Sequence, residues 1–241
     1  MRRNSLFIDK KMVKLYGVIK DYLLLKLYFL FTILYKYLRI NKLIDIIVYI
    51  SGIQLKSEEI KSIISVLEEK STSHFLIFGA GYDSYFWYKV NHNGNTIILE
   101  DRQDWIYETV KYVNREIVMP VTYSTIIEEW KNLLKDKKKL GMNLPSKIRE
   151  SSWDVILVDA PSGWYSGSPG RMQSIYEASR LISQRGYVFV HDCDRKVEDI
   201  YSDYLLGRKN VKNEPEEYKE EFKPKIILII DPDNGKIIDC S

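Results

Sequence analysis

The sequence predicts an α/β fold: a doubly wound, mostly parallel sheet, preceded by an N-terminal helical arm and followed by an antiparallel C-terminal hairpin. Three observations lead to this prediction. From residue 74 onward, short apolar runs alternate with amphipathic segments, the pattern of strands and helices that build a parallel sheet. All seven prolines lie at or beyond Pro120, so the first half of the chain lacks that helix breaker. The 241 residues, 45% of them hydrophobic, can bury one sizeable core.

The charge of the chain is divided between a basic start and a mildly acidic remainder. Residues 1–42 hold ten Lys or Arg against two Asp, a local charge of +8, which leaves −5 for the other residues because the total is +3. A nucleic-acid-binding domain needs a basic surface, so we expect no nucleic-acid partner for the main domain. The two cysteines, Cys193 and Cys240, are too few for a disulfide framework or a four-thiolate zinc site.

We assign residues 1–54 to a basic, hydrophobic helical arm. Residues 22–35 contain no Gly or Pro and predict one helix, and a second helix is expected over residues 42–50 with a break at Gly52. The apolar stretch is a poor match to a membrane span, because Lys26 near its centre would cost about 2.5–3.5 kcal/mol on insertion. Three interpretations stay open: a helix lying on a membrane surface, an atypical signal anchor, or a helix packed on the main domain or on another subunit.

Residues 55–241 form the main domain in this assignment. A first helix is expected from Ser57, because the apolar residues that follow have the spacing of one buried helical face: Ile60, Ile63, Ile64 and Leu67. Five strands are expected at residues 74–78, 95–99, 116–119, 153–158 and 186–190. Two more strands, at residues 225–230 and 235–239, would pair as a hairpin around the turn between them.

The ends of the first two strands predict a cofactor site, because ligands of a parallel sheet bind beyond the carboxyl ends of its strands. The Gly79-Ala80-Gly81 turn offers close backbone approach and free N–H groups at a helix start. Glu100 follows about 20 residues later, where an acid can accept hydrogen bonds from a ribose. Ser84 stands where the dinucleotide fingerprint has its third glycine, so S-adenosylmethionine, which has no phosphates, fits better than NAD. The full set of expected cofactor residues is Gly79, Gly81, Asp83, Glu100 and Asp101.

The ends of the fourth and fifth strands predict the chemistry. Trp164 and Tyr165 can stack on a sugar, and Arg171 can pair with a substrate carboxylate. His191 or Asp159 could take a proton as general base, with Asp192 orienting the imidazole; the alternative is a purely structural His191. Asp159 and Asp192, with His191, could instead hold a divalent metal ion. The expected catalytic residues are therefore His191, Asp159 and Asp192, and the expected substrate-binding residues are Trp164, Tyr165 and Arg171.

Five blocks of sequence stand at or beside these strand ends: residues 78–84, 91–94 with 99–101, 153–163, 169–176 and 188–198. In this order they resemble the glucuronoxylan 4-O-methyltransferase and xylan-biosynthesis domain family, over roughly residues 57–230. The resemblance implies a Rossmann-like class I methyltransferase fold that moves a methyl group from S-adenosylmethionine to a sugar hydroxyl, the 4-OH of glucuronic acid in the plant members. The sequence departs from the family at residues 164–168, where a more acidic stretch is replaced, and in the link at 183–186.

The residues and the resemblance together predict an S-adenosylmethionine-dependent O-methyltransferase acting on a sugar hydroxyl of a glycan, with a uronic acid 4-OH as one candidate. Three alternatives stay open: an enzyme of the same fold that methylates a small molecule or a protein, a non-catalytic scaffold in glycan assembly, and a nucleotide-sugar or NAD enzyme, which the missing third glycine disfavours. We also expect the protein to be membrane-associated through residues 1–42, peripherally at the cytoplasmic face, and at the Golgi in a eukaryotic cell.

Overall fold

The structure is a computed structural model that describes residues 10–207, with side chains described over residues 22–206. The described residues belong to two compact units, and the boundary between the units falls between Ser57 and Glu58. The predicted C-terminal hairpin lies outside the described residues.

The first unit consists of two helices that pack against each other, α1 (Lys10–Leu38) and α2 (Lys42–Ser51). Helix α1 is longer than the predicted 22–35 and continues in both directions, through Gly17 at its amino end, because no Pro interrupts residues 10–38. Gly52 ends α2 with a φ of 74°, a left-handed conformation that favours glycine, so the predicted break is confirmed. Within residues 10–207, no helix combines the length and the apolar character that crossing a membrane would require.

The second unit contains a five-stranded sheet whose neighbouring strands are all parallel. Its strands are β1 (His74–Phe78), β2 (Asn95–Glu100), β3 (Val118–Pro120), β4 (Trp153–Val158) and β5 (Ile182–Val190). They lie in the order β3-β2-β1-β4-β5. This is the order of a doubly wound sheet, in which the direction of winding reverses between β1 and β4. The predicted Rossmann-like fold is confirmed, and the reversal marks where such sheets bind ligands.

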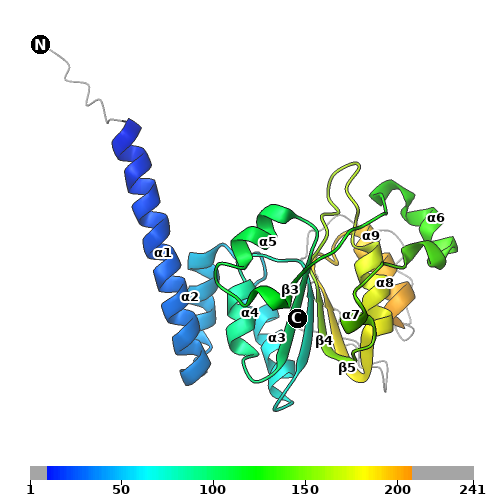
Figure 1. Ribbon diagram of the computed structural model, residues 1–241, viewed down its shortest axis with the longest axis horizontal. Coiled ribbons are helices and arrows are strands. Elements are labelled where there is room, and N and C mark those ends of the chain that lie inside the picture. The colour runs from blue at the N-terminus through cyan, green and yellow to red at the C-terminus, as the bar shows by residue number, and fades with distance from the viewer. Residues whose placement is uncertain (1–9, 208–241) are drawn as a thin grey trace, which may run out of the picture. The chain divides into compact units, whose positions relative to one another are not determined.

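Helices cover both faces of this sheet (Figure 1), with α3, α4 and α5 on one side and α7, α8 and α9 on the other. The helices of this unit are α3 (Ser57–Glu68), α4 (Ser84–Val90), α5 (Gln103–Thr109), α6 (Trp130–Lys135), α7 (Ser146–Arg149), α8 (Met172–Leu181) and α9 (Lys196–Ser202). Short 3-10 turns lie at Arg115–Ile117, Ile127–Glu129 and Lys137–Leu140, and a π turn at Asp203–Gly207.

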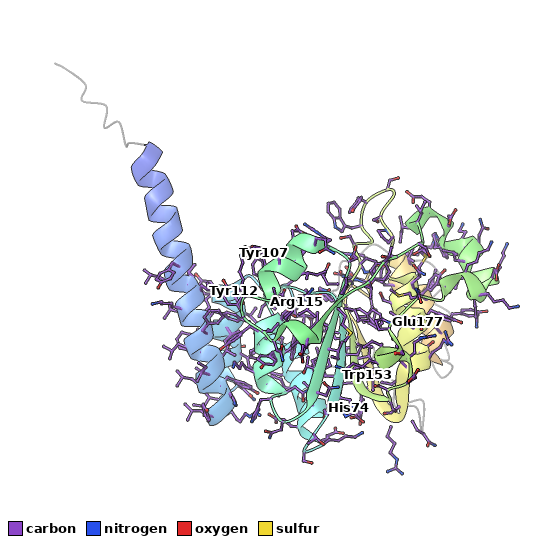
Figure 2. The ribbon with its side chains drawn as sticks, in the orientation of Figure 1. His74, Tyr107, Tyr112, Arg115, Trp153 and Glu177 are labelled. Atoms are coloured by element: carbon purple, nitrogen blue, oxygen red, sulfur yellow. The ribbon has the colours of Figure 1, made fainter. Side chains whose placement is uncertain are left out.

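The core follows from the alternation of side chains along the strands. Phe75 packs edge to face on Trp87 of α4, with ring centroids 5.7 Å apart. Its neighbour Leu76 points to the other face and joins the cluster that contains Ile175 of α8. In Figure 2, His74 and Trp153 mark the amino ends of β1 and β4, which is the end of the sheet away from the predicted site.

Three strands differ from their predicted bounds: β2 ends one residue later, at Glu100, and β3 and β5 begin at other residues. β3 begins at Val118 because a 3-10 turn forms first, where the side chain of Asn114 accepts a hydrogen bond from Glu116 N at 3.1 Å. β5 begins at Ile182, directly after α8, instead of at residue 186. The first half of β5 is polar, a pattern that predicts a loop. Among the described strands β5 borders only β4, and its first half is partly exposed, so polar side chains are tolerated in it.

Candidate functional site

The carboxyl ends of β1, β4 and β5 meet at one level, because backbone hydrogen bonds continue the sheet one residue past each strand. Three amides make these bonds: Gly79 to the Leu99 carbonyl at 2.8 Å, Asp159 to that of Phe78 at 2.9 Å, and His191 to that of Val158 at 3.0 Å. Residues that the sequence placed at separate strand ends therefore stand side by side across the β1/β4 reversal, the ligand-binding position of a doubly wound sheet.

The turn after β1 requires glycine at residue 79. Gly79 has a φ of 115°, and a Cβ there would stand 2.9 Å from Cβ of Ala160, so any side chain would push this turn away from the turn after β4. Gly81 N donates to Oγ of Ser84 at 2.9 Å, at the start of α4. The turn thus presents bare backbone at the site, as a closely approaching ligand needs.

Glu100 ends β2 as a buried carboxylate that ties two loops together. Its Oε2 accepts a hydrogen bond from Ala80 N at 2.6 Å, and its Oε1 accepts one from Arg102 N at 2.8 Å. Burial raises the pKa of Glu100 to about 7, although the two N–H donors act in the opposite direction. Because a carboxylate has about four lone-pair sites, both oxygens can still accept hydrogen bonds from ribose hydroxyls.

The other two predicted cofactor acids also lie in partly buried surroundings. Asp101 directly follows Glu100, and burial is the main cause of its raised pKa. Asp83 accepts a hydrogen bond from Nε1 of Trp87 at 2.7 Å, and burial, followed by the charge of Asp159, raises its pKa to about 6. The turn after β1 is therefore electrostatically coupled to the catalytic candidate after β4.

Asp159, His191 and Asp192 form one cluster at the ends of β4 and β5. Nδ1 of His191 lies 2.7 Å from Oδ1 of Asp159 and 3.6 Å from Oδ2 of Asp192. Asp192 has a φ of 61°, in the left-handed region, where Asp is found more often than most residues. Nη2 of Arg195 lies 3.0 Å from Oδ2 of Asp192. The structure thus brings together the three residues predicted to be catalytic.

Asp159 and His191 stabilise each other's charged form. Burial by itself would lower the pKa of His191, but the hydrogen bond with Asp159 and the charges of Asp159 and Asp192 raise it above its ordinary value. Burial would raise the pKa of Asp159, but the hydrogen bond from His191 and the charges of Arg171 and His191 lower it. Asp159 therefore stays ionised and engages Nδ1 of the imidazole, which leaves Nε2 to exchange a proton with a ligand.

Arg171 joins the two carboxylates from inside the protein. It is only 5% exposed, with Nη1 2.8 Å from Oδ2 of Asp192 and Nη2 3.0 Å from Oδ1 of Asp159. Nη1 also donates to the backbone carbonyl of His191, and Nη2 to that of Asp159. In the structure the guanidinium of Arg171 lies between the carboxylates of Asp159 and Asp192. Binding of a substrate carboxylate by Arg171 stays a prediction.

The metal candidates are the same three residues. One ligand atom from each of Asp159, His191 and Asp192 lies within 4.8 Å of the other two. Their oxygen and nitrogen atoms suit a hard or borderline divalent ion. Both carboxylates already bond to Arg171, so an ion that used the same oxygens would have to displace those contacts.

Trp164 and Tyr165 lie in the loop between β4 and α8. Trp164 is 73% exposed, and its ring packs edge to face on that of Tyr165, with centroids 5.0 Å apart. Glu128 holds the tip of the loop, because its Oε1 accepts hydrogen bonds from Ser166 Oγ at 2.5 Å and from Gly167 N at 3.0 Å. Exposed rings on a held loop can stack on the apolar face of a sugar, as predicted for them.

Sequence reasoning missed four residues beside the site: Tyr123, Gln173, Ser174 and Glu198. Oγ of Ser174 lies 3.1 Å from the Tyr123 hydroxyl, and Oε1 of Gln173 accepts a hydrogen bond from Ser124 N at 2.8 Å. These bonds attach the segment after β3 to the start of α8. No local pattern marks Tyr123, whereas Glu198 had a signal, since it ends the last block that carried the family resemblance.

Comparison with known proteins supports the resemblance. The chain is 39% identical over 161 residues to glucuronoxylan 4-O-methyltransferase 2 of Arabidopsis thaliana, across 57% of this chain and 54% of that protein. It is 33% identical over 181 residues to arabinogalactan O-methyltransferase 2 of the same plant, across 65% of this chain and 62% of that protein. The chain thus spans a little over half the length of these curated relatives.

Among solved structures, the chain is similar to a putative caffeoyl-CoA O-methyltransferase from Staphylococcus aureus. The TM-score is 0.43 and the identity 12%, over 70% of this chain and 83% of that one. We draw no conclusion about the function of this chain from a similarity with this TM-score and identity. The family described as IRX15/IRX15L/GXM matches residues 58–142 and 134–220. Because these residues make up more than half of the chain, the protein belongs to the IRX15/IRX15L/GXM family.

Proposed function

We propose that this chain is an S-adenosylmethionine-dependent O-methyltransferase that acts on a sugar hydroxyl of a glycan. The observation that carries the proposal is the Asp159–His191 pair, which lies across the β1/β4 reversal from the glycine turn whose Ala80 N is bonded to Glu100. Two relatives named as O-methyltransferases of glucuronoxylan and arabinogalactan support a glycan acceptor.

The cofactor end of the site is Glu100 with the turn after β1. S-adenosylmethionine would supply a methyl group on a positively charged sulfur. The acceptor oxygen would attack the methyl carbon in line with the carbon–sulfur bond, and S-adenosylhomocysteine would leave. The chain's own part is to bind and orient: Glu100 accepts hydrogen bonds from the ribose, while Gly79 and Gly81 keep side chains away from the methionine portion. Asp83 and Asp101 add negative charge near the cationic cofactor.

The acceptor end is His191 with Asp159. A sugar hydroxyl is a poor nucleophile at neutral pH, so a base must take its proton as the bond to the methyl group forms. His191 takes this proton at Nε2, and Asp159 stabilises the resulting imidazolium through Nδ1. Trp164 and Tyr165 would hold the sugar ring, and a uronic acid 4-OH is the acceptor to test first.

A divalent ion offers a second way to activate the hydroxyl. Asp159, His191 and Asp192 would hold it, and its charge would lower the pKa of a coordinated hydroxyl. A methyl-transfer assay with labelled cofactor over a panel of glycans and uronic acids, with and without chelator, tests both ideas. Loss of turnover with chelator, restored by a divalent ion, assigns activation to the ion; unchanged turnover assigns it to His191 and Asp159 alone.

The same assay separates the competing functions. Turnover on small molecules or proteins, with none on any glycan, would favour the first alternative. Cofactor binding without turnover on the whole panel would favour a non-catalytic scaffold. Binding of NAD in place of S-adenosylhomocysteine in a thermal-shift screen would contradict the cofactor assignment.

We further propose that the arm attaches the protein peripherally to the cytoplasmic face of a membrane. Apolar side chains along α1 are exposed, among them Leu23, Leu27 and Leu30. Basic residues accompany them, and no acid occurs from residue 22 to residue 44. An exposed apolar stripe with flanking cations fits the interface of an anionic lipid bilayer, where each near-surface Lys or Arg contributes about 1 kcal/mol.

A further inference from the structure

Two buried ionisable side chains beside the cluster of Asp159, His191 and Asp192 have polar atoms without a hydrogen-bond partner. Within the part of the chain that the structure describes, Nε of Arg171 has none, and neither carboxylate oxygen of Glu198 has one. Glu198 is 1% exposed and Arg171 is 5% exposed. A buried polar atom without a hydrogen-bond partner is strongly unfavourable in a protein interior, so each of these atoms requires a partner that no described protein atom provides directly.

Glu198 lies on α9, under the base of the loop that carries the aromatic pair. Its Oε1 is 2.7 Å from the point where a Cβ at Gly163 would stand, so the carboxylate lies directly against that glycine. The base of the loop closes there, because Gly170 N donates to the Ser162 carbonyl at 3.0 Å. A side chain at residue 163 would require the carboxylate of Glu198 to move. Glycine at this position therefore leaves room for Glu198.

The charges around Glu198 identify Arg171 as its electrostatic partner. Burial raises the pKa of Glu198, and the guanidinium of Arg171 is the largest influence that opposes the rise. Arg195 acts in the same sense more weakly, and Asp192 acts against it. Arg171 therefore stabilises the ionised form of Glu198, and the two groups act on each other in the same buried region.

Arg171 has one nitrogen to spare for this partner. Nη1 and Nη2 are committed to Asp192 and Asp159, so only the Nε–H lacks an acceptor. We propose that Glu198 is a positioning residue: across one bound water that accepts from the Nε–H of Arg171, it holds the guanidinium that joins Asp159 to Asp192. A buried carboxylate and a buried N–H can both be satisfied by one bridging water.

The kinetic consequence rests on the proposed function. If Arg171 loses its third support, Asp159 is held less firmly and the imidazole of His191 loses its fixed orientation. The turnover number should then fall, while the Michaelis constant for S-adenosylmethionine should not change, because Glu100 is held by the backbone N–H groups of Ala80 and Arg102. A residue needed only for folding would lower stability without this split.

The first experiment measures Arg171 itself and needs no activity. The Nε–H signal of Arg171 is recorded by NMR in the full chain and assigned by its disappearance in Arg171→Lys. We expect slow exchange of this proton with solvent, and at least about tenfold faster exchange in Glu198→Gln, the change that losing one charge-assisted hydrogen bond would cause. The matched control is Glu177→Gln, a buried acid on α8 that accepts a hydrogen bond from Met142 N at 2.7 Å (Figure 2).

The control separates a local effect from general loosening. Faster exchange in Glu198→Gln, with the parent rate in Glu177→Gln, supports the proposal. The parent rate in Glu198→Gln, or equal acceleration in both variants, overturns it. Glu198→Asp keeps the charge on a shorter side chain, and we expect it to restore part of the protection.

The second experiment measures turnover. We expect Glu198→Gln to lower kcat by about tenfold or more, with KM for S-adenosylmethionine unchanged within about twofold. In an Arg171→Lys background the same substitution should add less than about twofold, because Glu198 acts through Arg171. Full additivity overturns the proposal. A parent chain without methyl transfer on any acceptor contradicts the proposed function instead, and the exchange measurement still decides the role of Glu198.

Discussion

Nδ1 of His191 and Oδ1 of Asp159 are 2.7 Å apart, across the carboxyl ends of two neighbouring parallel strands. The pairing follows from the register of the sheet, in which Val158 of β4 lies opposite Val190 of β5, so the next residue of each strand is a partner of the other. The same row continues to β1, where Phe78 lies opposite Val158. A base, its orienting acid and a glycine turn are therefore brought together by the register of the three strands.

Asp159→Asn tests this pairing. The amide keeps the shape of the side chain but loses its charge, so the imidazolium that forms during turnover is no longer stabilised. We expect kcat to fall by about 10² or more, while the affinity for S-adenosylhomocysteine, measured by calorimetry, stays within about twofold of the parent. Asp154→Asn is the control, because Asp154 lies at the other end of β4, where its Oδ2 accepts a hydrogen bond from His74 N at 2.9 Å. Equal turnover of the parent and Asp159→Asn would exclude Asp159 from the chemistry.

Glu100→Gln tests the ribose assignment. The amide replaces one carboxylate oxygen by a donor, which cannot serve both the N–H of Ala80 and a ribose hydroxyl. We expect the affinity for S-adenosylhomocysteine to fall by at least about tenfold, the effect of one hydrogen bond to a charged group. Glu116→Gln on the exposed 3-10 turn should bind like the parent. Unchanged affinity in a folded Glu100→Gln protein would remove Glu100 from the cofactor site.

The pH dependence of cofactor binding tests the raised pKa of Glu100. Burial raises that pKa to about 7, so below this pH the carboxyl group of the free protein is largely protonated. Ribose hydroxyls donate to the ionised form, so binding favours ionisation and releases protons when the pH is at or below about 7. Affinity should therefore fall as the pH drops through 7. Calorimetry in buffers of different ionisation enthalpy measures the protons released, and no release at pH 6 would contradict the assignment.

The arm makes a separate prediction about membranes. Deleting residues 1–42 should abolish sedimentation with vesicles that contain phosphatidylserine, while methyl transfer to a soluble acceptor continues. Leu27→Asp with Leu30→Asp places charge in the exposed apolar stripe and should weaken vesicle binding without the deletion. Equal binding to neutral and anionic vesicles would contradict the role of the basic residues. Loss of folding on deletion would favour the packed-helix interpretation.

The parts of the site that the sequence predicted are those at strand ends. A run such as residues 155–158 is apolar because it is buried on both faces of the sheet, and the first polar residue after it, Asp159, stands at the ligand edge. The same logic places Glu100 and His191. The family resemblance added the reaction, which strand ends alone do not specify.

The parts that the sequence did not predict depend on contacts between distant segments. Arg171 directly precedes α8 and is expected from the sequence to bind a substrate carboxylate, but the packing of α8 against β4 and β5 buries it between two acids. Glu198 reads as one acid among several on a short helix, and its burial follows from the loop above it. The early start of β5 was missed because it depends on one pairing, Ile182 opposite Trp153, which an irregularity over residues 183–186 separates from the regular register that resumes at Tyr187.

The most direct test of the proposed function is methyl transfer from labelled S-adenosylmethionine to a uronate-bearing oligosaccharide, measured for the parent chain and for His191→Ala under single-turnover conditions. We expect label in the sugar with the parent, and a rate lower by about 10² or more with His191→Ala, while both proteins bind S-adenosylhomocysteine equally. Transfer by His191→Ala at the parent rate would contradict the assignment of His191 as the base.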